Sequence, residues 1–452
     1  MISVYGTFNA KDILITKGAL TEVLSRCKYY ELDGEVNIID EDFLKEFNRL
    51  ENVYLTKGLR ILLVACGFDN KEEDLILKGF LTLTDIPKQS AKEAILRLKE
   101  SGIMMKILTG DTLFNARYIC NEIGLKNLGM ITGDELDLLD DLALKIAVEE
   151  CQVFAKLTPT HKELIVKTLK ENGHTVGFMG DGVNDVLALC QADVAISFKE
   201  ASEIAQSVSK VIMLENDLNV LNKGVREGRR IYINMLKYIK STLASNFGNI
   251  ISIVVASIFL PFLPMLSFQI LILNLTYDIA MSIIPWDKVD EEYLATPKKW
   301  DSSDLKRIMF TFGPISSIFD IITYVVLFFV ICPLVAGGKF GMEGTNNVLF
   351  IAVFHTGWFI ESMWTQTLVI HVMRTDKTRF IKSIPSIKLV VFSLMATLVL
   401  TILPYTKTGD KIGFEPLPIY FYIFLFVIVI GYALLVTLVK KIYIKKNEYL
   451  LA

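Results

Sequence analysis

The chain has 452 residues, of which 52% are hydrophobic, and its mean hydropathy of +0.44 is too high for an ordinary soluble enzyme. Its formal net charge of −3 gives no reason to expect a nucleic-acid partner. Charged side chains crowd about the first 240 residues, and the remainder holds apolar runs long enough to cross a bilayer. The composition therefore predicts a soluble part followed by a membrane part.

The six cysteines include no CxxC pair, and five of them lie in the predicted soluble part. This usage predicts reduced, structural thiols on a cytosolic face. Residues 1–9 alternate between polar and apolar side chains and hold no basic segment followed by an apolar core. No signal peptide is therefore predicted, and we expect the later helices to direct membrane insertion.

Residues 1–84 have the pattern of an α+β segment. Alternating and buried apolar runs predict strands at 2–8, 13–16 and 60–66. Helical periodicity predicts helices at 18–27 and 40–52.

From about Asp85 the pattern changes to a regular alternation of strands and helices. Strands are predicted at 103–108, 153–155, 175–179, 194–197 and 211–214, with helices at 90–101, 113–123 and 160–171. Alternation with short connections is typical of a parallel, doubly wound α/β sheet, whose ligand site lies at the carboxyl ends of the strands.

A helical pattern begins at Asp217 and continues into apolar sequence without a proline or a turn cluster. Six membrane spans are predicted, at roughly 242–263, 266–285, 311–333, 348–371, 386–405 and 417–439. The second span is the least apolar, and we expect it to be broken. Basic residues gather after the second, fourth and sixth spans, which the positive-inside rule places in the cytosol. The chain is therefore predicted to be a multi-pass protein of the cell membrane, with its soluble N-terminal part and its C-terminus in the cytoplasm.

A glycine-rich loop with two aspartates follows one predicted strand. The run Val176–Asp185 is an apolar strand that ends in Gly180-Asp181-Gly182, followed by Asn184 and Asp185. Glycines allow a tight turn beside a phosphate, and a carboxylate at the strand end can hold Mg²⁺ together with phosphate oxygens and water. A plain turn with solvated acids is the alternative reading, and the full motif after a strand disfavours it.

Two further motifs accompany this loop. Thr109-Gly110-Asp111 separates a predicted strand from a helix, where a hydroxyl and backbone N–H groups can meet a phosphate. The same triplet recurs at 132–134 and 408–410, and only the first copy is predicted to lie between a strand and a helix. Lys162 opens the helix after Phe154-Ala-Lys-Leu-Thr-Pro-Thr-His, where its ammonium could neutralise a phosphoryl group.

In this order the motifs resemble the phosphorylation domain of P-type ATPases, which has a haloacid-dehalogenase-like fold. The resemblance implies that Asp181 is the catalytic Mg²⁺ ligand with Asp185 beside it. It further implies that the phosphoryl group is surrounded by Thr109, Gly110, Asp111, Lys162 and Asn184.

The same resemblance divides the chain into three parts. Residues 1–84 look like the end of the nucleotide-binding domain, 85–232 like the phosphorylation domain and 233–452 like the membrane domain with six helices. ATP would be contacted by Lys17, Gly18, Arg60 and Lys156. The segment Thr84–Lys88 resembles the hinge between the first two domains, although Ile86 stands where the family usually has a proline.

The family pattern also includes parts that these 452 residues lack. No DKTGT motif occurs, and Asp376–Arg379 only imitates it in a basic membrane loop. The actuator domain with its TGE loop and the first four membrane helices are absent as well. The chain therefore resembles the C-terminal half of a pump, and alone it should not form an aspartyl phosphate. A truncated gene, a fragmentary sequence and a separate chain that carries the N-terminal half all remain open.

Polar residues in the predicted spans suggest an ion path, because such side chains are costly in a bilayer unless they have a role. Asn246 and Asn249 lie one turn apart on the first span, and Asn274 and Asp278 one turn apart on the second. Interhelical hydrogen bonding without ion binding is the alternative. Asp320 and Glu361 are further acidic residues in spans, which we rank below Asp278 as ligands.

The membrane part closely resembles the bacterial magnesium-transporting P-type ATPases. The runs that carry this resemblance include Ser245–Asn249, Leu260–Met265, Asn274–Asp278, Ile284–Asp290, Phe312–Asp320 and Gly357–Glu361. The resemblance implies ATP-driven Mg²⁺ import. The alternatives are a pump for another cation such as Ca²⁺, and a non-catalytic membrane fragment or regulatory partner.

Overall fold

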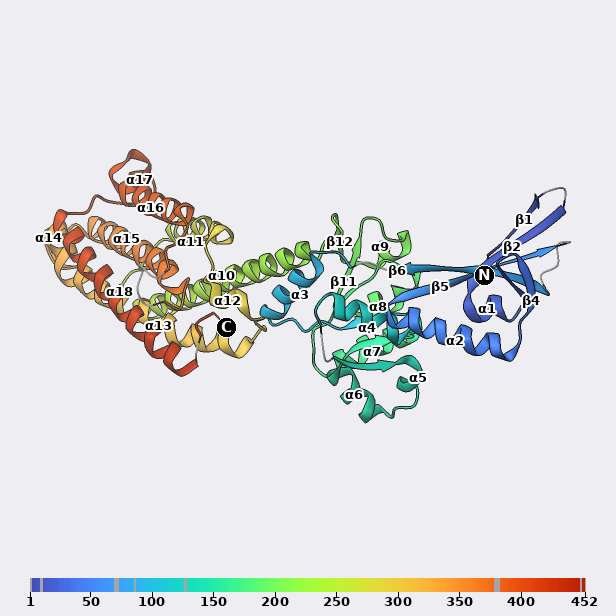
Figure 1. Ribbon diagram of the computed structural model, residues 1–452. Coiled ribbons are helices and arrows are strands. Elements are labelled where there is room, and N and C mark those ends of the chain that lie inside the picture. The colour runs from blue at the N-terminus through green and yellow to red at the C-terminus, as the bar shows by residue number, and fades with distance from the viewer. Residues whose placement is uncertain are drawn as a thin grey trace. The chain divides into compact units, whose positions relative to one another are not determined.

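The computed structural model describes residues 2–8, 11–68, 73–84, 87–125, 128–377, 383–447 and 449–451 (Figure 1). The chain forms two compact units, an N-terminal unit, Met1–Lys223, and a C-terminal unit, Gly224–Ala452. Asp85 and Ile86 of the predicted hinge lie outside the described residues.

The first sheet of the N-terminal unit has six strands in the order β1-β2-β5-β6-β3-β4. Only the pairing of β3 with β6 is parallel. The strands are β1 (Ile2–Phe8), β2 (Lys11–Ala19), β3 (Cys27–Leu32), β4 (Glu35–Ile38), β5 (Leu59–Phe68) and β6 (Leu75–Thr84). Leu14, Leu63 and Leu75 form its core with residues of α1 (Leu20–Leu24) and α2 (Glu41–Thr56).

The structure confirms the predicted strands of this sheet and corrects one helix. Gly18 and Ala19 continue β2, where they pair with Leu63 and Leu62 of β5, so the helix predicted over 18–27 is confined to α1. Helix α2 forms as predicted, because the Asp40 side chain caps it by accepting a 2.8 Å hydrogen bond from the Phe43 N–H.

The parallel α/β part of the N-terminal unit contains two three-stranded sheets, in the orders β7-β9-β8 and β10-β11-β12. Every pairing is parallel, as predicted. The strands are β7 (Ile107–Leu108), β8 (Gly129–Thr132), β9 (Cys151–Ala155), β10 (Gly177–Met179), β11 (Val194–Phe198) and β12 (Val211–Met213).

Helices alternate with these strands. They are α3 (Ala91–Glu100), α4 (Leu113–Glu122), α5 (Gly133–Leu136), α6 (Asp141–Glu150), α7 (Pro159–Glu171), α8 (Val186–Gln191) and α9 (Glu203–Val208). Several of these elements were not predicted. Strand β8 and the helices α5, α6, α8 and α9 were missed. Strand β7 is far shorter than the predicted 103–108 because only Ile107 and Leu108 pair with β9.

The part of the chain that the structure describes includes six helices long and apolar enough to cross a membrane, which confirms the predicted number. They are α10 (Leu218–Phe259), α11 (Ser267–Met281), α13 (Ser302–Val326), α15 (Asn347–Met373), α16 (Ile387–Ile402) and α18 (Ile419–Asn447). A π-helical turn, Leu327–Ile331, joins α13 to α14 (Cys332–Ala336), and the short helices α12 (Glu291–Ala295) and α17 (Lys407–Lys411) lie in loops.

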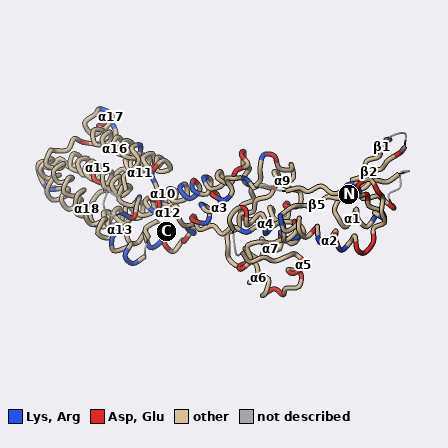
Figure 2. The backbone as a smooth tube through the Cα atoms, in the orientation of Figure 1, with Lys and Arg blue, Asp and Glu red and all other residues tan. Residues whose placement is uncertain are grey.

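Figure 2 marks Lys, Arg, Asp and Glu positions throughout the N-terminal unit and few along α15, α16 and α18. Helix α15 is buried on nearly every side, whereas α16 and α18 expose large apolar side chains such as Val399 and Phe426. The burial of α15 places this helix at the centre of the helical bundle. The exposed apolar side chains of α16 and α18 are what a lipid-facing surface requires.

Buried ion pairs join the loops at one end of this bundle. The Asp287 carboxylate accepts hydrogen bonds from Lys237 Nζ at 2.7 Å, from Arg374 Nε at 2.8 Å and from the Ser386 N–H at 3.0 Å. Burial alone would raise the pKa of Asp287, but the charges and hydrogen bonds of Lys237 and Arg374 outweigh it and hold this pKa below its usual value.

Candidate functional site

The loop after β10 is built around a glycine that no other residue could replace without a shift. The Gly180 N–H donates to the Ile196 carbonyl at 3.1 Å, and Ser197 Oγ donates to the Gly180 carbonyl at 2.9 Å. A Cβ added at Gly180 would lie 2.5 Å from the Cβ of Asp185. The missing side chain therefore lets the Asp185 side chain fold back against the end of the strand.

Asp185 is the hydrogen-bonded centre of this loop. The residue is only 9% exposed, and its Oδ2 lies 3.3 Å from the N–H groups of both Asp181 and Gly182. Its Oδ1 accepts a 2.7 Å hydrogen bond from Lys162 Nζ. Asp181 and Asn184 are exposed on the same loop. One carboxylate is thus held by the protein and a second is turned to solvent.

Helix α7 carries Lys162 in its first turn. Thr158 caps the helix, because its Oγ1 accepts a 3.3 Å hydrogen bond from the His161 N–H. In turn, His161 Nδ1 accepts a 3.3 Å hydrogen bond from the Thr158 N–H. Pro159 occupies the first turn, where its missing N–H costs nothing. This capping fixes where α7 begins and so directs Lys162 to Asp185.

Backbone hydrogen bonds join the loop after β7 to the loop after β9. The Leu157 N–H donates to the Thr109 carbonyl at 3.1 Å, and the Lys156 N–H donates to the Asp111 carbonyl at 2.7 Å. The Asp111 N–H in turn donates to Thr109 Oγ1 at 3.1 Å. Lys156 has a left-handed backbone, with φ of 51°, at this junction. Gly110 lies exposed in the loop.

The structure therefore brings the predicted residues together in two bonded groups. Lys162, Asp181 and Asp185 form one group, and Thr109, Asp111 and Lys156 form the other. The segment Leu157–Thr158 leads from the second group directly into α7, which carries Lys162. Both groups lie at the carboxyl ends of parallel strands, where ligands bind in open α/β sheets.

Asp181 and Asp185 have the chemistry of a Mg²⁺ site. No group of three or more His, Cys, Asp and Glu side chains among the described residues could hold a metal ion. Such a site is not required, because Mg²⁺ usually takes one or two protein carboxylates and completes its shell with phosphate oxygens and water. The hard oxygen donors and the exposure of Asp181 fit that mode of binding.

The predicted nucleotide residues belong to the six-stranded sheet. Lys17 is exposed and Gly18 is buried in β2, and the backbone of Arg60 belongs to the neighbouring strand β5. The side chain of Arg60 lies outside the described residues.

The second copy of the Thr-Gly-Asp triplet, at 132–134, corrects one expectation. It too lies between a strand and a helix, since β8 ends at Thr132 and α5 begins at Gly133. Thr132 caps α5 and binds Glu135, and the hydrogen bond from the Thr132 N–H, followed by that from its hydroxyl, lowers the pKa of Glu135. Here the threonine hydroxyl is used for capping, so the strand-to-helix context alone does not mark a phosphate site.

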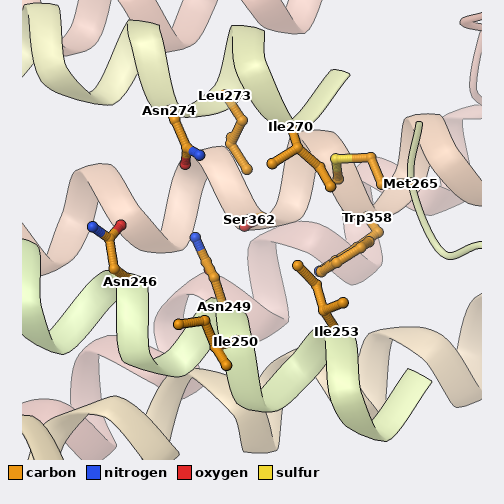
Figure 3. A pocket seen from close by; sticks show the side chains of 10 residues that line it. All are labelled: Asn246, Asn249, Ile250, Ile253, Met265, Ile270, Leu273, Asn274, Trp358 and Ser362. Atoms are coloured by element: carbon orange, nitrogen blue, oxygen red, sulfur yellow. The ribbon is translucent and has the colours of Figure 1, made fainter. Parts of the chain in front are cut away.

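The C-terminal unit holds a pocket of about 340 Å³ between α10, α11 and α15 (Figure 3). Three predicted ion residues line it, namely Asn246, Asn249 and Asn274. The fourth, Asp278, is exposed and is not among the lining residues. The sequence reasoning missed Ser362, which lines the pocket from α15.

A neighbouring amide positions one of these asparagines. Gln366 Nε2 lies 3.1 Å from Asn249 Oδ1 and 2.8 Å from Ser362 Oγ. Gln366 and Ser362 lie one turn apart on α15, a spacing that could have marked them in the sequence as a polar pair on one face of a predicted span.

Two family models match the chain. One is described as a haloacid dehalogenase-like hydrolase and covers residues 14–193, and the other, described as cation transporting ATPase, C-terminus, covers residues 262–442.

Curated relatives match nearly the whole chain. The protein named magnesium-transporting ATPase, P-type 1, from Escherichia coli (strain K12) is 40% identical over 442 residues, which are 96% of this chain and 48% of that protein. Its namesake from Salmonella typhimurium (strain 14028s / SGSC 2262) is 41% identical over the same shares. Calcium-transporting ATPase 1 of Bacillus cereus (strain ATCC 10987 / NRS 248) is 31% identical over 289 residues, 62% of this chain and 32% of that protein. The chain thus spans about half the length of the magnesium-transporting relatives that it matches.

Proposed function

We propose that this chain, which belongs to the P-type cation-transporting ATPases and matches their C-terminal half, is part of an ATP-driven pump that imports Mg²⁺ into the cytoplasm. The observation that carries the proposal is the bonded group of Lys162, Asp181 and Asp185 at the end of a parallel sheet. The identity of 40% to a magnesium-transporting ATPase over 96% of the chain supports the choice of ion.

Each residue of the site has a role in this proposal. Asp181 and Asp185 hold the catalytic Mg²⁺, which supplies positive charge to the phosphoryl oxygens when it is bound. Lys162 adds a second positive charge, and Asp185 keeps its ammonium in place. The phosphoryl group is further surrounded by Thr109, Gly110, Asp111 and Asn184.

Nucleotide binding is assigned to the region before this site. ATP is the substrate, contacted by Lys17, Gly18, Arg60 and Lys156. Residues 1–84 then end the nucleotide-binding domain, 85–232 form the phosphorylation domain and 233–452 form the membrane domain.

The transported cation is placed in the pocket of the C-terminal unit. Amide and hydroxyl oxygens of Asn246, Asn249, Asn274 and Ser362 suit a hydrated cation, since Mg²⁺ gives up its water reluctantly. Asp278 of α11 does not line this pocket, and we still propose it as a ligand of the transported cation. The six helices make the chain a multi-pass membrane protein. We place it in the cell membrane, with the N-terminal unit and the C-terminal end of the chain in the cytoplasm.

Two edge strands of the parallel α/β part could pair with a strand from the other half of the pump. Strands β7 and β10, which precede the two motifs, are edge strands, and both are only partly buried. Their neighbours β9 and β11, with partners on both sides, each hold three consecutive buried residues. A strand of the missing half that carries the phosphorylated aspartate would pair with β7 and β10 and lie between the two motifs. Without that half the chain is expected to be inactive.

Co-expression tests the proposal. The chain is produced together with the N-terminal half of a magnesium-transporting relative in cells that cannot import Mg²⁺. We expect growth at low Mg²⁺ that Asp181→Ala abolishes and that Asp141→Ala, a change at an exposed acid of α6, preserves.

The two alternatives predict different results. A pump for Ca²⁺, which the Bacillus cereus relative suggests, would give calcium uptake and no growth at low Mg²⁺. A non-catalytic fragment or regulatory partner would give neither, and growth that survives Asp181→Ala would contradict the role of Asp181.

A further inference from the structure

Two carboxyl groups lie buried in the helical bundle. Asp320 of α13 is 2% exposed, and Glu361 of α15 is 0% exposed. The side chains are close enough to interact directly. Two ionised carboxylates in contact within an apolar interior would repel each other and would lack the solvation that each needs.

Asp320 has the hydrogen bonds that an anion requires. Its Oδ2 accepts from Ser252 Oγ of α10 at 2.6 Å, and its Oδ1 accepts from Trp358 Nε1 of α15 at 2.8 Å. The carboxylate is therefore held by donors from two different helices, which suits a buried charge.

Glu361 is in the opposite situation. Neither of its carboxyl oxygens has a hydrogen-bond partner among the described residues. The titratable groups near the pair are the tyrosines Tyr324 of α13 and Tyr432 of α18, and no described Lys, Arg or His forms an ion pair with either carboxyl. A bare Glu361 carboxylate here would be an uncompensated buried charge.

Binding of one proton would remove the repulsion between the two buried carboxylates without breaking any existing hydrogen bond, whereas binding of a metal ion would not. One proton on Glu361 turns an acceptor into a donor, and the pair then carries a single charge that Ser252 and Trp358 already solvate. Both Asp320 oxygens are occupied by donors, and neither acid lines the pocket, so a metal would have to displace existing bonds.

We propose that Asp320 and Glu361 bind one proton between them and form a proton-binding site beside the cation pocket. The link to the pocket is short, because Trp358 lines the pocket and also donates to Asp320, and Ser362, which follows Glu361, lines it too. The proton belongs to the pair and not to one residue. This site goes beyond the proposed transport function and can be tested without it.

Infrared spectroscopy of the full chain in lipid nanodiscs tests the proposal. A protonated carboxyl has a C=O band that is separate from carboxylate bands and shifts when hydrogen is exchanged for deuterium. At neutral pH we expect this band in the native chain and the loss of one carboxyl equivalent in Glu361→Gln. The matched control Glu343→Gln changes an exposed acid before α15 and should leave the band intact.

Two results would overturn the proton site. One is a native chain without a protonated carboxyl at neutral pH, which the native spectrum decides even if Glu361→Gln does not fold. The other is a band that changes when a chelator is added, since that would show a metal cation at the pair. Persistence of the full band in a folded Glu361→Gln would equally contradict the assignment.

Discussion

Replacing Gly180 with alanine should disrupt the loop that carries the predicted catalytic aspartates. The added Cβ would lie 2.5 Å from Asp185 Cβ and 2.8 Å from its Cγ, closer than non-bonded carbons approach in proteins. Asp185 must then move away from the strand end. Overpacking of this kind costs about 2 kcal/mol. Weakening the two hydrogen bonds from Asp181 and Gly182 adds about 1 kcal/mol.

The sum, about 3 kcal/mol, corresponds to about a hundredfold larger equilibrium constant for opening of the loop, and so to about a hundredfold faster hydrogen exchange. Hydrogen exchange of the full chain, read by mass spectrometry over residues 177–199, measures this opening. Gly182→Ala is the matched control, because a Cβ there would meet its nearest neighbours at 3.8 Å, an ordinary contact. Equal exchange rates in the two variants would refute the reasoning.

Three further variants test other parts of the structure. Lys162→Met removes a partly buried hydrogen bond to the Asp185 carboxylate, so the same exchange experiment should show a loss of about 2 kcal/mol near Asp185. Asp287→Asn leaves two buried basic side chains without their anion and should lower the free energy of unfolding in detergent by about 3–5 kcal/mol. Because the folded-state pKa of Asp287 lies below its unfolded value, its stabilisation is present above about pH 4 and is lost as the pH falls through the folded pKa, which acid denaturation of native and variant chains should show. Gln366→Leu frees Asn249, and in a complemented pump it should weaken cation affinity about two- to tenfold, as measured by uptake at graded Mg²⁺; unchanged affinity would exclude a positioning role.

Local patterns were sufficient for much of the fold. The alternation of strands and helices after Asp85 predicted a parallel α/β part, and six apolar runs predicted the six long helices. The helix predicted over 18–27 was wrong because pairing with β5 holds Gly18 and Ala19 extended, an interaction with residues about 45 positions away in the chain. The four-residue strand β8 was too short to give a periodic signal.

The candidate sites, too, were predicted where they depend on local motifs and were missed where they depend on the packing of helices. Motif order predicted the loops that the structure joins in two bonded groups, one around Asp185 and one at Thr109 and Lys156, because each motif directly follows a strand. The pocket was harder to predict, since its lining comes from three helices and only their packing brings Ser362 beside Asn249. Packing also decides that Asp278 is exposed, whereas Asp320 and Glu361, which we ranked below it, are buried. Helix periodicity does not reveal which neighbour each polar face will meet.

Phosphoenzyme formation tests the central claim most directly. Membranes that contain this chain and a matching N-terminal half are given radiolabelled ATP, and acid-stable label on the N-terminal half is measured. The account predicts labelling that requires both halves and disappears with Asp181→Ala in this chain. Labelling that is unchanged by Asp181→Ala, or that the N-terminal half attains alone, would contradict it.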